Sequence, residues 1–129
     1  MEIHIPSGIT KKQEMEVTLD DTAACFGSGL IEVFATPAMV GFMEGTAQSS
    51  VQTYLPEGFI TLGIEINVKH FKATPVGMKV FCESKFTKID GGKLFFEIKA
   101  WDENGDIGKA THVRYIVEAK KFIEKLINQ

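Results

Sequence analysis

The chain has 129 residues, of which 44% are hydrophobic and 24% are charged, and its formal net charge is −3. This length favours a single domain spanning residues 1–129, and the composition excludes a disordered or low-complexity protein. The acidic charge argues against nucleic-acid binding, which normally requires a basic patch or stripe.

Export, membrane insertion and metal binding find no support in the sequence. The N-terminal residues lack the apolar stretch and cleavage site of a signal peptide, and no uncharged apolar run reaches the roughly 20 residues of a membrane helix. Cys25 and Cys82 lie far apart, without a CxxC motif or companion histidines. We therefore expect a cytoplasmic protein with reduced cysteines and with no metal or other cofactor.

The first half of the chain predicts two short strands and one long helix. Residues 14–19 alternate charged and apolar side chains, as in a strand, and a loop rich in Asp, Gly and Ser follows. Residues 31–35 are again strand-like. A helix is then expected from Thr36 to about Leu55, because Pro37 suits the first helical position and Pro56 ends the apolar stretch.

From residue 61 the pattern changes to the two-residue period of strands. Ile64, Ile66, Val68 and His70 are expected to share one face of the first of these strands. Asp-Gly and Asn-Gly pairs then mark two hairpin turns. Further strands are expected at 79–88, 93–101 and 107–117. The pattern therefore predicts a meander of four antiparallel strands, followed by a short amphipathic helix at 119–128.

Together these elements predict an α+β fold. An antiparallel sheet needs cover for its apolar face, and the long helix is the one predicted element able to provide it. That helix is apolar or small on nearly all sides, as expected if the sheet curls around it.

Glu44 is the one charged residue in the stretch 35–55. At about 100° per residue, four apolar residues form a stripe along the helix, and Glu44 falls inside it. The stripe consists of Val40, Ala47, Val51 and Leu55. Because burying a carboxylate without partners costs several kcal/mol, Glu44 must be hydrogen-bonded, protonated or facing a pocket. It is therefore a candidate functional residue.

His70 and Thr36 are further candidates, each with a structural alternative. His70 continues the apolar face of its strand, so it should point toward the helix, where it either shares a ligand with Glu44 or forms a structural pair with it. The hydroxyl of Thr36 either has a chemical role or caps the first turn of the helix as its N-cap.

The cations are unevenly distributed. All lysines and arginines except Lys11 and Lys12 lie from Lys69 onward. Two interpretations are open: these side chains cover solvated strand faces, or some of them meet the phosphates of a ligand.

The order of elements resembles the hotdog fold, in which a curved antiparallel sheet wraps one long helix. More narrowly, the segments EVFATPAMVGFMEG, LGIEINVKHFKATPVG and GKATHVRYIV resemble the fluoroacetyl-CoA thioesterase family, over about residues 14–118. The resemblance implies hydrolysis of a short-chain acyl-CoA thioester to free acid and CoA, with CoA entering only as part of the substrate. It also implies sites at the interface of a homodimer, with further pairing into a higher homo-oligomer left open.

The resemblance also implies site residues. The family's catalytic threonine, glutamate and histidine fall on Thr36, Glu44 and His70. Its substrate-binding positions fall on Gly63, Arg114 and Phe34.

The chemistry expected of these residues leaves alternatives open. Glu44 would attack the thioester carbonyl or activate water, His70 would orient or protonate, and Thr36 or a helix N-terminal N–H would stabilise the oxyanion. The alternative to an enzyme is a non-catalytic module that binds acyl-CoA or another small ligand. A purely structural dimer is disfavoured by a carboxylate inside the apolar stripe.

Overall fold

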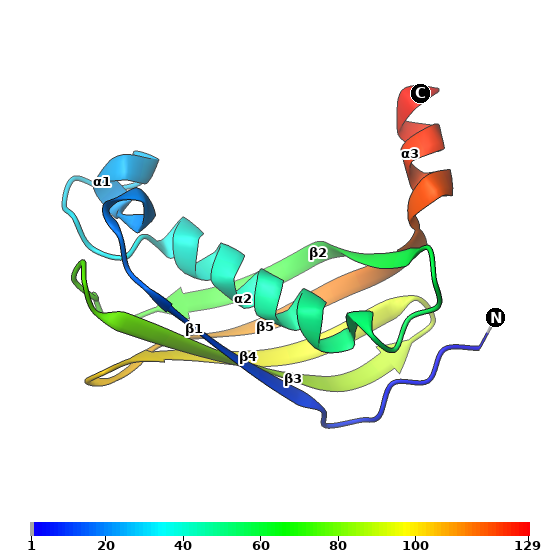
Figure 1. Cartoon of the computed structure of the whole chain (residues 1–129), viewed down its shortest axis with the longest axis horizontal. Coiled ribbons are helices and arrows are strands. Elements are labelled where there is room, and N and C mark those ends of the chain that lie inside the picture. The colour runs from blue at the N-terminus through cyan, green and yellow to red at the C-terminus, as the bar shows by residue number, and fades with distance from the viewer. Residues whose placement is uncertain (1) are drawn as a thin grey trace.

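The computed structural model describes residues 2–129 and shows a five-stranded antiparallel sheet that curves around one long helix (Figure 1). The strands are β1 (Thr10–Glu16), β2 (Phe59–His70), β3 (Lys79–Asp90), β4 (Lys93–Asp102) and β5 (Gly105–Glu118), and the helices are α1 (Ala23–Phe26), α2 (Thr36–Gln52) and α3 (Ala119–Ile127). We call the sheet face toward α2 the inner face and the opposite one the outer face. The predicted α+β fold, a curved antiparallel sheet around one long helix, is confirmed.

The strand order is β1-β3-β4-β5-β2, so the predicted four-strand meander is wrong. Only β3, β4 and β5 follow one another as neighbours, while β2 pairs with β5 at one edge and β1 pairs with β3 at the other. Residues 71–78 carry the chain across the sheet between β2 and β3. Turn signals fix only pairs joined by tight turns, and this longer connection, although it contains Pro75 and Gly77, joins strands that are not neighbours.

Some of the local predictions for the rest of the chain are confirmed, and others are wrong. The two hairpins and the C-terminal helix lie where the turn residues and the apolar pattern placed them. The strand expected at 31–35 is reduced to two isolated bridges, Thr22 with Phe34 and Val33 with Pro75. The first strand begins and ends earlier than expected. It ends earlier because the chain turns at Leu19–Asp21, where the Asp21 carboxylate accepts hydrogen bonds from the N–H and the hydroxyl of Thr18.

Helix α2 runs along the inner face of the sheet and supplies the centre of the core (Figure 1). Its fully buried apolar side chains are Met39, Met43, Ala47 and Val51. This buried row differs from the predicted stripe, whose Val40 and Leu55 are only partly buried. Glu44 follows Met43 by roughly 100° around the helix. It therefore lies at the border of the buried face, half-buried, and not at its centre.

A β-bulge between Gly63 and Glu65 changes which residues of β2 face inward. Gly63 pairs with Arg114 and Glu65 with Val113, which leaves Ile64 as the inserted residue. Ile64 was expected on the inner face but is 54% exposed. Because the bulge inserts one residue, Gly63 and His70 both face inward although seven positions separate them.

Helices α1 and α3 contribute no buried residue to the core. The C-terminal helix α3 projects away from the sheet (Figure 1). Across the described residues, no helix combines the length and the apolar character needed to cross a membrane.

Candidate active site

Thr36 and His70 form a hydrogen-bonded pair at the start of α2. Thr36 Oγ1 lies 2.8 Å from His70 Nδ1, which joins the first residue of the helix to the last residue of β2. The other ring nitrogen, Nε2, is buried and has no hydrogen-bond partner among residues 2–129. Burial lowers the pKa of His70 from the ordinary histidine value, which favours its neutral form. This ring therefore has one engaged and one open nitrogen.

The hydroxyl of Thr36 does not cap the helix, so the N-cap alternative is wrong. The N-cap is Ala35, whose extended backbone accepts from the Met39 N–H at 3.0 Å, and no side chain caps this end. The Thr36 side chain instead points to His70, and the residue is exposed. The Thr36 hydroxyl is therefore bonded to His70 and is not used to cap the helix.

Phe34 packs against the imidazole of His70. It is 1% exposed, and its ring meets His70 edge-on, with centroids 6.3 Å apart and planes at 76°. Its N–H donates to the carbonyl of Thr74. Phe34 therefore fixes the orientation of the imidazole from within the core.

Glu44 lies against Gly63 on the neighbouring part of the inner face. A Cβ atom on Gly63 would fall 2.7 Å from Glu44 Oε2, 3.2 Å from His112 Cε1 and 3.3 Å from Arg114 Nη1. Three polar side chains therefore converge on the space that the missing side chain leaves. Gly63 is needed here for this close approach, and no positive φ requires it.

Arg114 is buried and is held by several bonds. Its Nε donates to Thr61 Oγ1 at 2.7 Å, Nη2 donates to the Thr61 carbonyl at 2.9 Å, and Nη1 lies 3.2 Å from His112 Nε2. A guanidinium has five N–H groups, so two remain for other partners. The negative charge of Glu44 favours the charged form of this guanidinium, against the effect of burial, which lowers its pKa. Arg114 thus presents a fixed positive charge beside the carboxylate.

His112 is a member of this cluster that the sequence analysis missed. Its Nδ1 lies 2.7 Å from the Glu65 carbonyl, which can only accept, so Nδ1 carries the proton and Nε2 accepts from Arg114. Burial lowers the pKa of His112 below 6.5, and the charge of Arg114 acts in the same direction. The alternation along β5 that turns Arg114 inward also turns His112 inward, and this signal was present in the sequence.

The two groups do not meet within one chain. The helix begins at Thr36, and the eight residues from there to Glu44 span about 12 Å along the axis. Thr36 and His70 therefore form one cluster of candidate residues, and Glu44, Gly63, His112 and Arg114 form a second cluster.

This arrangement offers groups suited to acyl transfer. A carboxylate next to a fixed guanidinium, and a neutral imidazole bonded to a hydroxyl, are the groups used for attack, proton transfer and oxyanion binding. In the described part of the chain, no group of three or more His, Cys, Asp or Glu side chains is placed to hold a metal ion.

Comparison with known proteins gives a consistent result. Residues 17–120 match the family described as fluoroacetyl-CoA-specific thioesterase. The fluoroacetyl-CoA thioesterase of Streptantibioticus cattleyicolor is 37% identical over 95 residues, which cover 74% of this chain and 68% of that protein.

Solved structures of such enzymes superpose closely. The fluoroacetyl-CoA thioesterase FlK matches with a TM-score of 0.92 and 29% identity over 98% of both chains. A point mutant of FlK in complex with fluoroacetate and CoA matches with a TM-score of 0.87 and 30% identity, over 92% of this chain and 99% of that one. A thioesterase superfamily member from Thermus thermophilus matches with a TM-score of 0.88 and 27% identity, over 97% and 92% of the two chains.

Proposed function

The chain belongs to the fluoroacetyl-CoA-specific thioesterase family, and from this premise we propose that it hydrolyses short-chain acyl-CoA thioesters to a free acid and CoA. The observation that carries the proposal is the Glu44 carboxylate, held against Gly63 beside the buried guanidinium of Arg114. A carboxylate at this place can attack a thioester carbonyl or activate a water molecule, the two roles that carboxylates take in hydrolases.

Glu44 acts on the thioester carbonyl by one of two routes. As a nucleophile it forms a mixed anhydride and releases the CoA thiolate, which takes up a proton, and water then cleaves the anhydride. As a base it removes a proton from water, whose oxygen adds to the carbonyl before CoA leaves as the thiol. Trapping with hydroxylamine under single-turnover conditions separates the routes when a hydroxamate on Glu44 itself is measured by mass spectrometry, because only the first route activates this carboxylate as an anhydride.

His70 and Thr36 complete the chemistry in this proposal. The neutral imidazole exchanges a proton through its open nitrogen, and Thr36 helps to hold His70 in place. In the tautomer whose Nδ1–H donates to Oγ1, the hydroxyl proton of Thr36 is free to donate to the oxyanion.

A two-fold dimer brings the two halves of the site together in this proposal. The helix does not start late, so Thr36 and Glu44 of one chain stay about 12 Å apart along the axis. Strand β2 is an edge strand of 12 residues, paired only with β5, and it carries both His70 and Gly63. Pairing of two such edges would set Thr36 and His70 of one protomer against the Glu44 cluster of its partner.

The test of the reaction is Glu44→Gln. Thiol release from acetyl-, propionyl- and fluoroacetyl-CoA should fall by about 100-fold or more, the range for loss of a catalytic carboxylate, with unchanged melting temperature. The matched control is Glu57→Gln, an exposed carboxylate after the helix, which should keep full turnover. Wild-type turnover in Glu44→Gln would reject the mechanism, and tight acyl-CoA binding without thiol release by the wild type would favour a binding module.

The shared site is tested by mixing two inactive variants. The Glu44→Gln and His70→Ala variants, refolded together, form hybrid dimers. In each hybrid, one of the two sites carries both native residues. If each site combines residues of two protomers, about a quarter of wild-type activity returns, because half of the dimers are hybrids with one intact site. If each site lies within one protomer, no activity returns.

A further inference from the structure

A row of lysines crosses the outer face of the sheet. The strand register places Lys69 of β2 opposite Lys109 of β5, and Lys109 opposite Lys99 of β4. Three adjacent strands therefore present a lysine at the same level. On the next strand the row continues with Glu83, which pairs with Lys99 at 3.4 Å.

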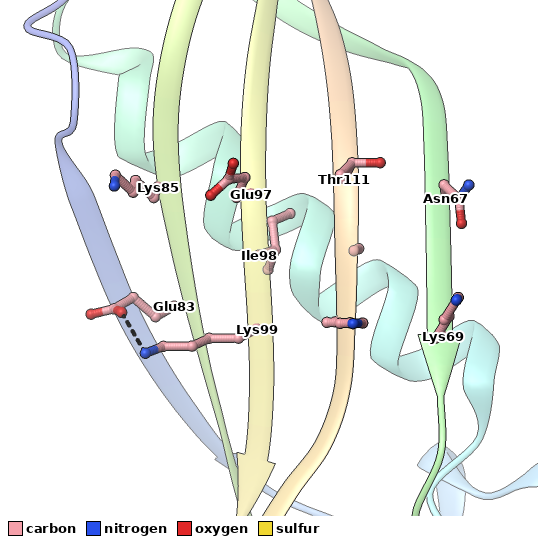
Figure 2. Close-up of a pocket in the computed structure, with 10 residues that line it drawn as sticks. Asn67, Lys69, Glu83, Lys85, Glu97, Ile98, Lys99 and Thr111 are labelled. Carbon is pink, nitrogen blue, oxygen red and sulfur yellow. Dashed lines mark ion pairs between the residues drawn. The ribbon is translucent and has the colours of Figure 1, made fainter.

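These lysines line a cleft of about 570 Å³ on the face opposite the Glu44 cluster. Figure 2 shows Lys69, Lys85 and Lys99 around it, with α2 behind the sheet. In all, four lysines and two glutamates line the cleft, and Asn67 and Thr111 add an amide and a hydroxyl. The walls are therefore mainly positive, in a chain whose net charge is −3.

This placement of charge does not help the fold. Like charges directly opposite each other on neighbouring strands are destabilising. Among the ion pairs within residues 2–129, Lys99 is bonded to Glu83, whereas Lys69 and Lys109 are bonded to no carboxylate. Lys85 lies outside this row, opposite Glu97. A solute anion would relieve the repulsion that these lysines exert on one another.

Charge also decides against a second copy of this chain as the occupant. Stacking two outer faces would bring one lysine row against another, which adds like charges at each contact. The complementary occupant is an anion. Neighbouring strands lie about 4.8 Å apart, so three lysines in a row fit a chain of linked phosphate groups better than a single carboxylate.

We propose that the outer face of the sheet binds an anion with two or more linked phosphate groups, through Lys69, Lys109 and Lys99. The sheet separates this site from Glu44 and Thr36, so it takes a ligand other than the acyl group of the substrate. Lys69 and His70 are consecutive in β2 and point to opposite faces, which sets the anion site back-to-back with the imidazole.

Trp101 is a built-in probe of this site, being the one tryptophan of the chain. Lys99 Nζ lies 5.7 Å from the centre of its ring, and Lys12 Nζ lies 5.5 Å from it. An anion that draws Lys99 away from the ring should change the fluorescence of Trp101.

The experiment is a titration of the full chain with tripolyphosphate in about 50 mM NaCl, where screening is weak, with sulfate at matched ionic strength as the reference. We expect saturable binding of tripolyphosphate, and about tenfold weaker binding by Lys69→Gln/Lys109→Gln. The control Lys120→Gln/Lys125→Gln removes the same charge from α3 and should bind within about twofold of the wild type. The melting temperature of the first variant without ligand should equal or exceed that of the wild type, which shows that it folds.

Three results would overturn the proposal. Equal weakening in both double variants would mean that only net charge matters. An identical fluorescence change with sulfate would mean ionic screening alone. The absence of a saturable response to tripolyphosphate would mean that the lysine row binds no chain of linked phosphate groups. None of these measurements depends on thioesterase activity, so the anion site and the proposed reaction stand or fall separately.

Discussion

Strands β2 and β5 carry polar residues on both faces, and the two faces use them differently. On the inner face, His112 and Arg114 are buried, and each is hydrogen-bonded to a named protein atom. On the outer face, Lys69 and Lys109 are exposed, lie opposite each other and pair with no carboxylate among the described residues.

The polar side chains of the inner face hold one another in place by hydrogen bonds, whereas Lys69 and Lys109 of the outer face have no carboxylate partner within residues 2–129. A buried polar group without a partner loses its hydration and gains nothing in return, so the inner face must be satisfied internally. An exposed lysine stays hydrated, so the outer face can keep charges that no protein group neutralises. Substitutions on the two faces should therefore have effects of opposite sign.

The largest effect is expected for His112→Phe. This change leaves the Glu65 carbonyl and Arg114 Nη1 without their buried partner, and should lower the free energy of unfolding by about 3 kcal/mol. His112→Gln keeps an amide oxygen that can accept from Arg114, and should recover part of this loss. Urea unfolding measures both. The control on the outer face is the neighbouring residue, Thr111→Val, for which we expect about 0.5 kcal/mol or less; similar losses at both positions would contradict the comparison.

The next effect concerns activity and should leave the fold intact. In Gly63→Ala, the new Cβ would lie 2.7 Å from Glu44 Oε2, the end of a flexible side chain, so the carboxylate moves aside. The side chains of His112 and Arg114, at 3.2 and 3.3 Å from the new Cβ, shift by a few tenths of an ångström. We expect kcat/KM to fall by about 10- to 100-fold, as for a misplaced catalytic group, with little change in melting temperature.

The matched glycine control for this prediction is Gly41→Ala, in the same helix as Glu44. A Cβ at Gly41 meets nothing within 4 Å, so this change should raise stability by up to about 1 kcal/mol and leave kcat/KM unaltered. Full activity in Gly63→Ala would show that the position of the carboxylate is not critical.

A smaller effect is expected from pH. The pKa values of His70 and His112 are lowered by burial, so below pH 6.5 the unfolded chain binds more protons at these residues than the folded one. Stability should therefore rise with pH up to the ordinary histidine pKa and fall as the solution is acidified below it. Chemical denaturation from about pH 7.5 to pH 5.5 measures this slope, and His112→Gln should reduce it. A slope of opposite sign would mean that the folded protein favours the charged imidazoles.

The smallest effect, with the opposite sign, is expected on the outer face. Lys109→Gln removes a charge that faces Lys69 and Lys99 across neighbouring strands. The free energy of unfolding should increase by roughly 0.2–0.5 kcal/mol at low salt, the lower range for cross-strand charge pairs. The gain should vanish in about 1 M NaCl, where the screening length is about 3 Å. A loss of stability would show that Lys109 supports the fold.

Much of the fold and part of the candidate site could be predicted from the sequence. The hairpin turns and the positions of β3, β4 and β5, to within two residues at each end, follow from turn residues and from two-residue alternation, which are local properties. Glu44 and His70 were singled out by helical and strand periodicity. The order of the strands and the loss of the strand at 31–35 could not be predicted, because both depend on which distant segments pair.

Periodicity alone thus determined that a carboxylate on α2 and a histidine on β2 lie near the inner face, since the spacing of side chains around a helix or along a strand is a local property. Tertiary structure decided the rest. A bulge turns Gly63 inward, and the strand register places Lys69 opposite Lys109. His112 contacts Arg114, and the hydroxyl of Thr36 binds His70 and does not cap the helix. Each of these contacts joins residues that share a face or a level only once the strands have paired, and pairing minimises free energy over the whole sheet.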